Sequence, residues 1–436
     1  MREQEIKNII EKQRTFYSEG ATLSIKYRKD ALKKLRDSIL KNSQIITEAL
    51  AADLGKSETE GFLAEISLTL AEISHMLKNL KKYMKDKTVK TGLANFVARS
   101  FIKKSPYGTV LIISPWNYPF LLTMEPLVDA LAAGNTVVLK PSAYSPNTSK
   151  VIKKIIAETF DEYEVAVIEG GREENKCLLE QKFDYIFFTG SKSVGQKVLE
   201  AASKHITPVT LELGGKSPCI IEKTANIALS AKRIVFGKFL NCGQTCVAPD
   251  YILCDKSTKD KLVKELKKQI KLQFTNAPLV NKDYGKIINK KHFDRLLGLI
   301  NPEKVVHGGS SDGNTLKIEP TIMDCVSYDD KVMQEEIFGP ILPILTYDSL
   351  EEVISKVNSG EKPLALYIFS ENKKIINQVL SKCQFGGGCV NDVIMHLVSS
   401  DMGFGGVGGS GMGSYHGKYG FDTFTHEKSI VDKKLL

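Results

Sequence analysis

The stretch TVLIISPWNYPFLLTMEPLVDALAAGNTVVLKPS, residues 109–142, decides the fold. Two short runs rich in β-branched residues, 109–114 and 136–140, flank a helical candidate over 124–133. The pattern continues with apolar runs at 164–169 and 184–189 and helical candidates at 148–160 and 194–204. Strands that alternate with helices at this spacing predict βαβ units and a parallel, doubly wound sheet. Ligands of such sheets bind at the carboxyl ends of the strands, so the loops that follow these runs are where a site is expected.

The regions on either side complete an α/β protein. Before residue 84, apolar residues recur at helical spacing and Gly55 is a plausible helix stop, with a second amphipathic run at 60–83. After LELGGKSP (211–218) a second α/β region is predicted. Its expected helices lie at 257–272 and 283–300, and its expected strands lie near 341–347 and 363–369.

Length and composition bound the class of protein. A chain of 436 residues predicts two or three domains, and 42% hydrophobic with 25% charged residues is ordinary for a globular protein. The net charge of +9 is spread over segments in which acids are interleaved, so a nucleic-acid partner is not expected. The charged N-terminus lacks a secretory signal, and no stretch is long enough to anchor in a bilayer. Eight cysteines without an export signal favour free thiols in the cytoplasm.

The glycine-dense tail contains a false cofactor motif. Gly403, Gly405 and Gly408 match G-x-G-x-x-G, but no apolar strand precedes them and no helical period follows. We interpret the tail as a loop whose glycines permit close approach of backbone segments.

FTGSKSVG (188–195) is a better candidate for cofactor binding. It joins a predicted strand to a predicted helix, and Gly190 and Gly195 have the spacing of P-loop glycines. Gln196 and Lys197 follow in place of Lys-Ser/Thr, which argues against a nucleoside triphosphate site. The local sequence fits a dinucleotide pyrophosphate at a helix N-terminus and an ordinary βα turn equally well.

Two thiols stand four positions apart in FLNCGQTCVAPDY (239–251). The chain offers no companion Cys or His pair at zinc-finger spacing, so no metal site is expected. An arbitrary free cysteine is most often a small buried hydrophobe. Cys246 differs, because small and polar neighbours allow the access and thiolate character that a nucleophile needs.

Two further polar residues lie at predicted strand ends. Glu212 interrupts an otherwise apolar strand ending, where a carboxylate is costly unless it is paired or functional. Asn117 follows a strand, between Trp116 and Tyr118, and alone would be a turn former. The residues themselves leave both a structural and a functional role open for Glu212 and for Asn117.

Taken together, these segments resemble the aldehyde dehydrogenase superfamily over almost the whole chain. The residues that carry the resemblance are PWNYP (115–119), KPS (140–142), FTGSKSVG (188–195), LELGGKSP (211–218), NCGQTC (241–246), EEIFGP (335–340) and FGGVGGSGMG (404–413). VNDVIMH (390–396) and GMGSYHGKYGFDTFTH (411–426) are similar to the class 3 branch, which includes fatty-aldehyde and aromatic-aldehyde enzymes. Membrane-bound members of that branch end in a hydrophobic tail, and this chain resembles the soluble forms.

The resemblance implies a role for each matching residue. Cys246 matches the nucleophile, Glu212 the general base, and the Asn117 amide with the Cys246 N–H the oxyanion hole. Lys140 and Glu336 match the residues that hold the two riboses of NAD, and Phe338 lies beside the nicotinamide. The other residues expected to contact the cofactor are Ser114, Trp116, Gly190, Ser191, Gly195 and Gly214.

The activity that follows is NAD(P)-dependent oxidation of aliphatic or aromatic aldehydes to carboxylic acids. It would proceed through a thiohemiacetal and a thioester on Cys246. A CoA-acylating enzyme and a non-catalytic protein on the same scaffold are the alternatives. Ala143 replaces a glutamate common in the family, and we expect use of both NAD and NADP because no carboxylate repels a 2′-phosphate. Tyr118, Ile394 and Met395 line an apolar tunnel or belong to the core.

The resemblance also implies three structural parts and a homodimer. A dinucleotide-binding domain is expected over 1–84 and 105–213, and a catalytic domain over 214–385. Residues 85–104 and 386–436 would form a bridging element whose strands extend the partner's sheet.

Overall fold

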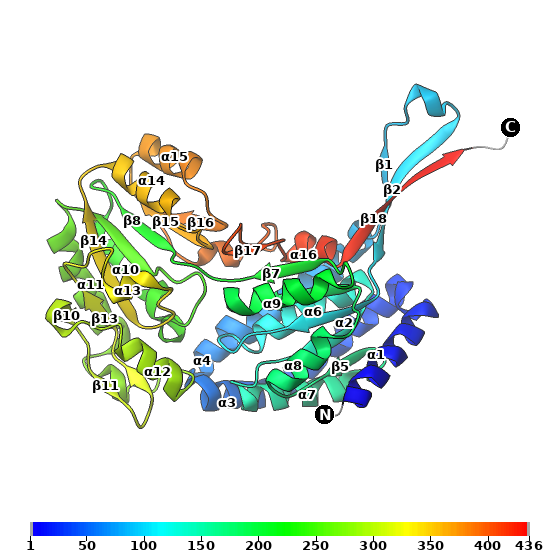
Figure 1. Cartoon of the computed structure of the whole chain (residues 1–436), viewed down its shortest axis with the longest axis horizontal. Helices are drawn as coiled ribbons and strands as arrows, with labels where there is room; N and C mark the ends of the chain where they lie inside the picture. The colour runs from blue at the N-terminus through cyan, green and yellow to red at the C-terminus, as the bar shows by residue number, and fades with distance from the viewer. Residues whose placement is uncertain (1–2, 434–436) are drawn as a thin grey trace.

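The computed structural model describes residues 3–433, and it contains two α/β regions side by side with a smaller sheet that projects from them (Figure 1). The first region is built on a six-stranded sheet. In spatial order its strands are β17 (Gly411–Met412), β7 (Val209–Glu212), β6 (Tyr185–Thr189), β3 (Thr109–Ile113), β4 (Thr136–Lys140) and β5 (Val165–Val167). All neighbours are parallel except β17, which is antiparallel to β7. The predicted doubly wound parallel sheet is therefore confirmed.

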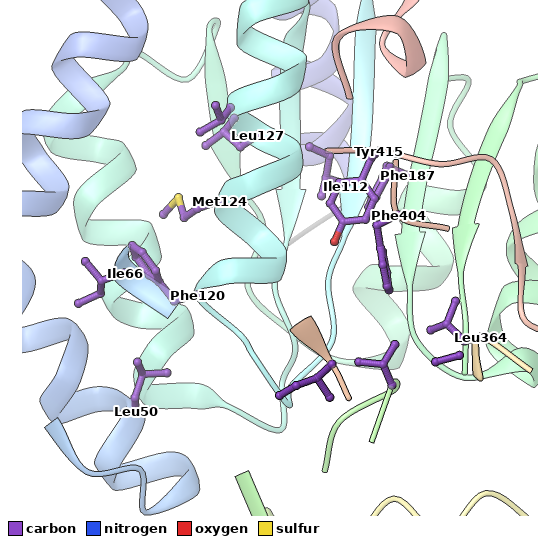
Figure 2. Packing of buried hydrophobic residues seen from close by; sticks show 14 of the residues in the cluster. Leu50, Ile66, Ile112, Phe120, Met124, Leu127, Phe187, Leu364, Phe404 and Tyr415 are labelled. Carbon is purple, nitrogen blue, oxygen red and sulfur yellow. The ribbon is translucent and has the colours of Figure 1, made fainter. Parts of the chain in front are cut away.

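Helices cover both faces of this sheet because successive residues of a strand point to opposite sides. Val110 and Ile112 of β3 pack into one hydrophobic cluster, and Leu111 and Ile113 pack into another. Figure 2 shows Ile112 in the first cluster together with side chains of the buried helix α6. The first face carries α2 (Ile25–Lys41), α3 (Ser43–Leu54), α5 (Ser67–Tyr83), α6 (Leu121–Ala133) and α7 (Pro146–Thr159); the second carries α1 (Glu3–Ser18), α8 (Arg172–Leu179) and α9 (Lys192–Ser203).

The second region is built on a seven-stranded sheet. In spatial order its strands are β10 (Val305–His307), β13 (Thr321–Met323), β14 (Ile341–Tyr347), β9 (Tyr251–Asp255), β8 (Pro218–Ile221), β15 (Ala365–Phe369) and β16 (Gly387–Val390). Its helices are α10 (Ile227–Phe239) and α11 (Lys259–Phe274) on one face, and α12 (Lys290–Leu297), α14 (Leu350–Ser359) and α15 (Lys373–Lys382) on the other. The expected second α/β region is confirmed.

The predicted helix over 283–300 is wrong for its first half. Only α12 is helical, and the preceding residues form a turn, bends and irregular backbone. Their backbone groups bond to distant segments instead, with the Lys286 N–H donating to the Leu54 carbonyl at 2.8 Å and the Ile287 N–H to the Leu316 carbonyl at 2.9 Å. Tertiary partners therefore satisfy the amides that a helix would have used.

Three antiparallel strands form a separate sheet: β1 (Lys87–Val89), β2 (Ala98–Pro106) and β18 (Thr425–Lys433). It projects away from both α/β regions (Figure 1). The expected bridging element over 386–436 requires a correction, because this tail is divided among three sheets. β16 pairs in parallel with β15, β17 joins β7, and only β18 reaches the projecting sheet, so the boundary at residue 385 cuts through the seven-stranded sheet. The local sequence does not reveal that strand pairing in this sheet continues beyond residue 385.

Candidate active site

The loop that carries Cys246 is conformationally strained. Three successive residues between α10 and β9 adopt the left-handed region, with φ of 51° at Asn241, 52° at Cys242 and 74° at Gly243. A Cβ at Gly243 would lie 2.3 Å from the Gly339 carbonyl oxygen, so only glycine fits there. Strain of this kind concentrates at functional sites, where the surrounding structure holds it in place.

Gln244 anchors this loop to the non-helical segment before α12. Its side-chain amide donates to the carbonyls of Asn241 and Lys286, each at 3.0 Å, and its carbonyl accepts from the Ile288 N–H at 3.0 Å. Gln244 is fully buried, so these bonds also satisfy a polar group that would otherwise be costly. Gln244 thus ties the thiol loop to this non-helical segment.

The two thiols of the loop lie in different environments. Cys242 is buried and packs in the core of the second α/β region, whereas Cys246 is partly exposed and lines a cavity. Burial, followed by the negative charges of Glu336 and Glu212, raises the pKa of Cys246 to about 12. Hydrogen bonds from the backbone N–H groups of Cys246 and Val247 lower this pKa. The free protein therefore holds a neutral thiol at neutral pH, and thiolate formation needs a base or a nearby positive charge.

Glu212 ends β7 as a buried, unpaired acid. Its backbone carbonyl accepts the Gly190 N–H at 3.0 Å, which joins it to the turn after β6. The side chain is 1% exposed, and within residues 3–433 neither carboxylate oxygen has a hydrogen-bond partner. Burial raises the pKa of Glu212 well above its ordinary value. The reading of Glu212 as a satisfied structural acid is therefore wrong.

Asn117 lies in the loop after β3 and contacts the thiol loop directly. Its side-chain amide donates to the Gln244 carbonyl at 3.1 Å, two residues before Cys246. The fold thus brings together Asn117, Glu212 and Cys246, which are far apart in sequence. An amide donor, a nucleophile and an unpaired carboxyl in one place suit addition to a carbonyl followed by hydrolysis.

Two predicted cofactor residues lie at the ends of β3 and β4. The Lys140 ammonium is buried, and its hydrogen bond goes to the Pro141 carbonyl at 2.8 Å. Burial lowers the pKa of Lys140 to about 8. Three N–H donors on an ammonium leave capacity for sugar hydroxyls. Ser114 is different, because its hydroxyl is already held by Thr123 at 2.5 Å.

The turn between β6 and α9 has the form of an anion site. Ser191 precedes the helix and is exposed, and its side chain makes no capping bond. The first N–H groups of a helix lack intrahelical acceptors, so they suit a pyrophosphate. A Cβ at Gly195 would lie 2.8 Å from Leu213, so glycine lets α9 pack close to the strand end.

The remaining predicted cofactor residues gather around the loop before β14. A Cβ at Gly214 would lie 2.5 Å from a carboxylate oxygen of Glu336, which places these residues in direct contact. Burial and then the charge of Asp250 raise the pKa of Glu336 to about 8. Trp116 and Phe338 meet edge to face with ring centroids 5.3 Å apart. An open helix end, a buried ammonium and a carboxyl beside an aromatic ring together fit a dinucleotide.

A cavity of about 580 Å³ leads to Cys246 between the two α/β regions. Tyr118, Ile394 and Met395 all line it, which confirms the tunnel reading, although Ile394 also packs in the core. Sequence reasoning missed other cavity residues, which come from segments spread from residue 57 to residue 416: Leu63, Leu121, Phe236, Phe404, Tyr415 and His416. Figure 2 shows Phe404 and Tyr415 beside each other. No local pattern could have grouped them.

A buried ion pair next to this site was also missed. Lys56 and Glu65 are both inaccessible to solvent and lie in a stretch, KSETEGFLAE, that reads as a solvated helix start. Within the described residues, no group of three His, Cys, Asp or Glu side chains could hold a metal ion. Nor does any helix between residues 3 and 433 combine the length and apolar character needed to cross a membrane.

Comparison with known proteins agrees with this geometry. Residues 1–430 match the model of the aldehyde dehydrogenase family. The chain is 51% identical to 4,4'-diaponeurosporen-aldehyde dehydrogenase of Staphylococcus aureus, covering 98% of this chain and 94% of that protein. It is 45% identical to aldehyde dehydrogenase family 3 member A2 of Rattus norvegicus (98% and 88% covered) and 44% identical to the dimeric NADP-preferring aldehyde dehydrogenase of the same species (99% and 95%).

A solved structure of Staphylococcus aureus AldH in its substrate-bound state has a TM-score of 0.97 at 50% identity, covering 99% of this chain and 94% of that one. The two chains thus share one fold over nearly their whole length. The predicted resemblance, including its class 3 character, is confirmed by the family 3 relatives. The protein is an enzyme that oxidises aldehydes with NAD(P), and the chain belongs to the aldehyde dehydrogenase family.

Proposed function

We propose that Cys246, Glu212 and Asn117 together catalyse the oxidation of apolar aldehydes to carboxylic acids. One observation above all supports this assignment. Cys246 is partly exposed at an apolar cavity, close enough to Glu212 for the two charges to interact, while the Asn117 amide is bonded to the backbone that precedes the thiol. The cavity walls favour a hydrocarbon chain, and the polar groups collect around Cys246.

The first step is addition of the Cys246 sulfur to the aldehyde carbon. The thiol proton leaves to a water molecule as the C–S bond forms, and Glu212 is kept for the later hydrolysis. The carbonyl oxygen becomes an oxyanion, which the Asn117 amide and the Cys246 N–H stabilise as its charge develops. An aldehyde has no leaving group except hydride, so collapse of this adduct must expel hydride and leave a thioester on Cys246. Bound NAD or NADP supplies the hydride acceptor.

The second step is hydrolysis of the thioester. Glu212 removes a proton from an attacking water, the C–S bond breaks, and the carboxylic acid leaves while Cys246 is restored. Burial raises the pKa of Glu212, so its carboxylate, once formed, is a stronger base than an ordinary carboxylate. The CoA-acylating alternative would release acyl-CoA instead, and it has no use for such a base.

Cys246→Ala and Cys242→Ala test the assignment as a matched pair. We expect Cys246→Ala to abolish reduced-cofactor formation from a long-chain aldehyde while NAD still binds. Cys242→Ala should retain the reaction, because that thiol packs in the core. Stopped-flow absorbance follows the reaction, and product analysis separates free acid from acyl-CoA. Undiminished oxidation by Cys246→Ala would overturn the proposed nucleophile.

We also propose that the enzyme uses both NAD and NADP. Ala143 is exposed and places no carboxylate where a 2′-phosphate would sit. The rat relative described as NADP-preferring supports this reading. Ala143→Glu should lower kcat/KM with NADP more than with NAD. Negligible NADP turnover by the wild type beside NAD, at matched saturation, would contradict the proposal.

A cytoplasmic homodimer is the assembly we propose. The projecting sheet of β1, β2 and β18 offers an open strand edge, which proteins normally cover. The same rat relative is described as dimeric. All eight cysteines are free thiols, as a reducing compartment requires. Sedimentation at micromolar concentration should give twice the mass of one chain, and a monomer would contradict the dimer.

A further inference from the structure

Lys56 and Glu65 form an ion pair that is sealed inside the protein beside the proposed active site. Lys56 follows α3 and its cap Gly55, and Glu65 lies in a π-helical segment, Phe62–Ile66, that precedes α5. Both side chains are 0% exposed, and the Lys56 Nζ and Glu65 Oε1 are 2.5 Å apart. A buried ion pair is weak grounds for stability, because desolvating two charges offsets their attraction. π-helical turns are frequent at functional sites.

The pair holds the loop after β3 at two points. The Lys56 ammonium donates to the Asn117 carbonyl at 3.0 Å. The second carboxylate oxygen of Glu65 accepts from the N–H groups of Phe120 at 2.8 Å and Leu121 at 3.2 Å, where α6 begins. Hydrogen bonds that involve charged groups are the strong ones. The backbone from the Asn117 carbonyl to Leu121 is therefore restrained by one buried unit.

The same contacts extend to the thiol loop. The Asn117 carbonyl that accepts from Lys56 also accepts from the Asn241 side chain at 2.7 Å, and the Asn241 N–H donates to Glu60 at 2.8 Å. Asn117 in turn donates to the Gln244 carbonyl at 3.1 Å. The residue expected to bind the oxyanion is thus fixed against the strained backbone that leads to Cys246, and Lys56 and Asn241 share its carbonyl oxygen.

We propose that Lys56, oriented by Glu65, is a positioning residue for the Asn117 amide in the oxyanion-binding site. The proposal rests on the role of Asn117 given above and adds the group that sets its geometry. The ammonium also lies 3.9 Å from the centre of the Tyr118 ring, so its position is determined on three sides. Preorganised donors avoid reorganisation during the reaction, and a misplacement of about 1 Å can cost about 10²-fold in rate.

A double-mutant cycle with Asn117 tests this coupling. Lys56→Met/Glu65→Gln removes both charges together, so neither is left buried alone, and glutamine retains an acceptor for the α6 amides. We expect this variant to slow the burst of reduced cofactor about 10²-fold, with little change in the Kd for NAD. Asn117→Ala should slow the burst by about 10²–10³-fold. Combining all three substitutions should be no slower than Asn117→Ala alone.

The control exchanges another, partly exposed Lys–Asp pair, which makes no hydrogen bond to Asn117 or to residues 241–246 among the described residues. Lys304 and Asp330 lie 2.6 Å apart in the second α/β region, and Lys304→Met/Asp330→Asn should leave the burst unchanged. If the Lys56 variant does not fold, Lys56→Gln, which retains one donor, is judged by the same cycle. Independent effects of the Lys56 and Asn117 substitutions would overturn the positioning role.

The cycle also separates this inference from the proposed function. A burst that survives Asn117→Ala at full rate removes Asn117 from the reaction and therefore contradicts the proposed function. A burst that is slowed by Asn117→Ala but is unaffected by the Lys56 variants contradicts only the inference. A lower KM for the aldehyde with unchanged burst rate would likewise exclude a role for Lys56 in the oxyanion site.

Discussion

Glu212→Gln separates the acidity of a buried side chain from its shape. Glu212 is almost completely buried, and neither of its carboxylate oxygens has a hydrogen-bond partner among the described residues. Glutamine has nearly the same volume, so the substitution removes no contact of the described structure and creates no cavity. Any change must therefore come from the lost ability to ionise.

The expected effect on stability follows from proton binding. Burial raises the pKa of Glu212 well above the ordinary value of 4.5. Above that value the unfolded chain releases the proton while the folded protein keeps it, so the free energy of unfolding falls as the pH rises. The slope for one such group approaches ~1.4 kcal/mol per pH unit between the two pKa values. As the pH rises, the free energy of unfolding of the wild type should fall by this amount per pH unit relative to that of Glu212→Gln. The fall ends when the pH reaches the raised pKa of Glu212.

Urea unfolding at about pH 5, 6 and 7 measures this difference, and the single tryptophan, Trp116, reports the transition. Stopped-flow kinetics on the same variant test its chemistry. The burst of reduced cofactor should persist, whereas turnover should fall ~10²–10⁴-fold because a general base is missing. Equal pH slopes for the two proteins would refute the unpaired buried acid, and equal slowing of burst and turnover would refute the role of Glu212 in hydrolysis.

Three other substitutions or probes give separate predictions. Because burial and nearby carboxylates raise the pKa of Cys246 to about 12, its alkylation by iodoacetamide should accelerate about tenfold per pH unit from about pH 7 to 9. Peptide mass spectrometry measures the rate of alkylation. A rate that does not change with pH would contradict the raised pKa. Met395→Trp narrows the cavity and should reduce kcat/KM for long-chain aldehydes about tenfold but not for short ones, so equal losses in a chain-length series would argue against the tunnel. Gly411→Ala should lower stability by about 1–3 kcal/mol, since φ is 152° and the new Cβ would lie 2.4 Å from the Leu211 carbonyl; Gly313→Ala, which meets open space, is the control in thermal melting.

Several features that cost stability lie close to Cys246. The left-handed turn at Asn241 and Cys242 precedes Cys246 in the same loop, and Glu212 is close enough to raise its pKa. Lys56, in the sealed pair with Glu65, donates to the Asn117 carbonyl. Each of these features costs stability by itself. Their presence together is understandable only if the surrounding α/β regions, with their extensive cores, hold them in place.

Local sequence was sufficient for the elements and for the chemistry of single residues. Apolar runs such as 109–113 predict strands because a strand needs only a few consecutive apolar residues. The small and polar neighbours of Cys246 are compatible with a nucleophile, because thiol reactivity depends on access and near neighbours. Packing decided everything that joins distant parts of the chain. Four features depend on partners that are far away in sequence. They are the non-helical segment before α12, the pairing of β16 with β15, the contact of Lys56 with Asn117 and the raised pKa of Glu212. Burial and hydrogen bonding are properties of the folded surroundings, so no window of local sequence contains them.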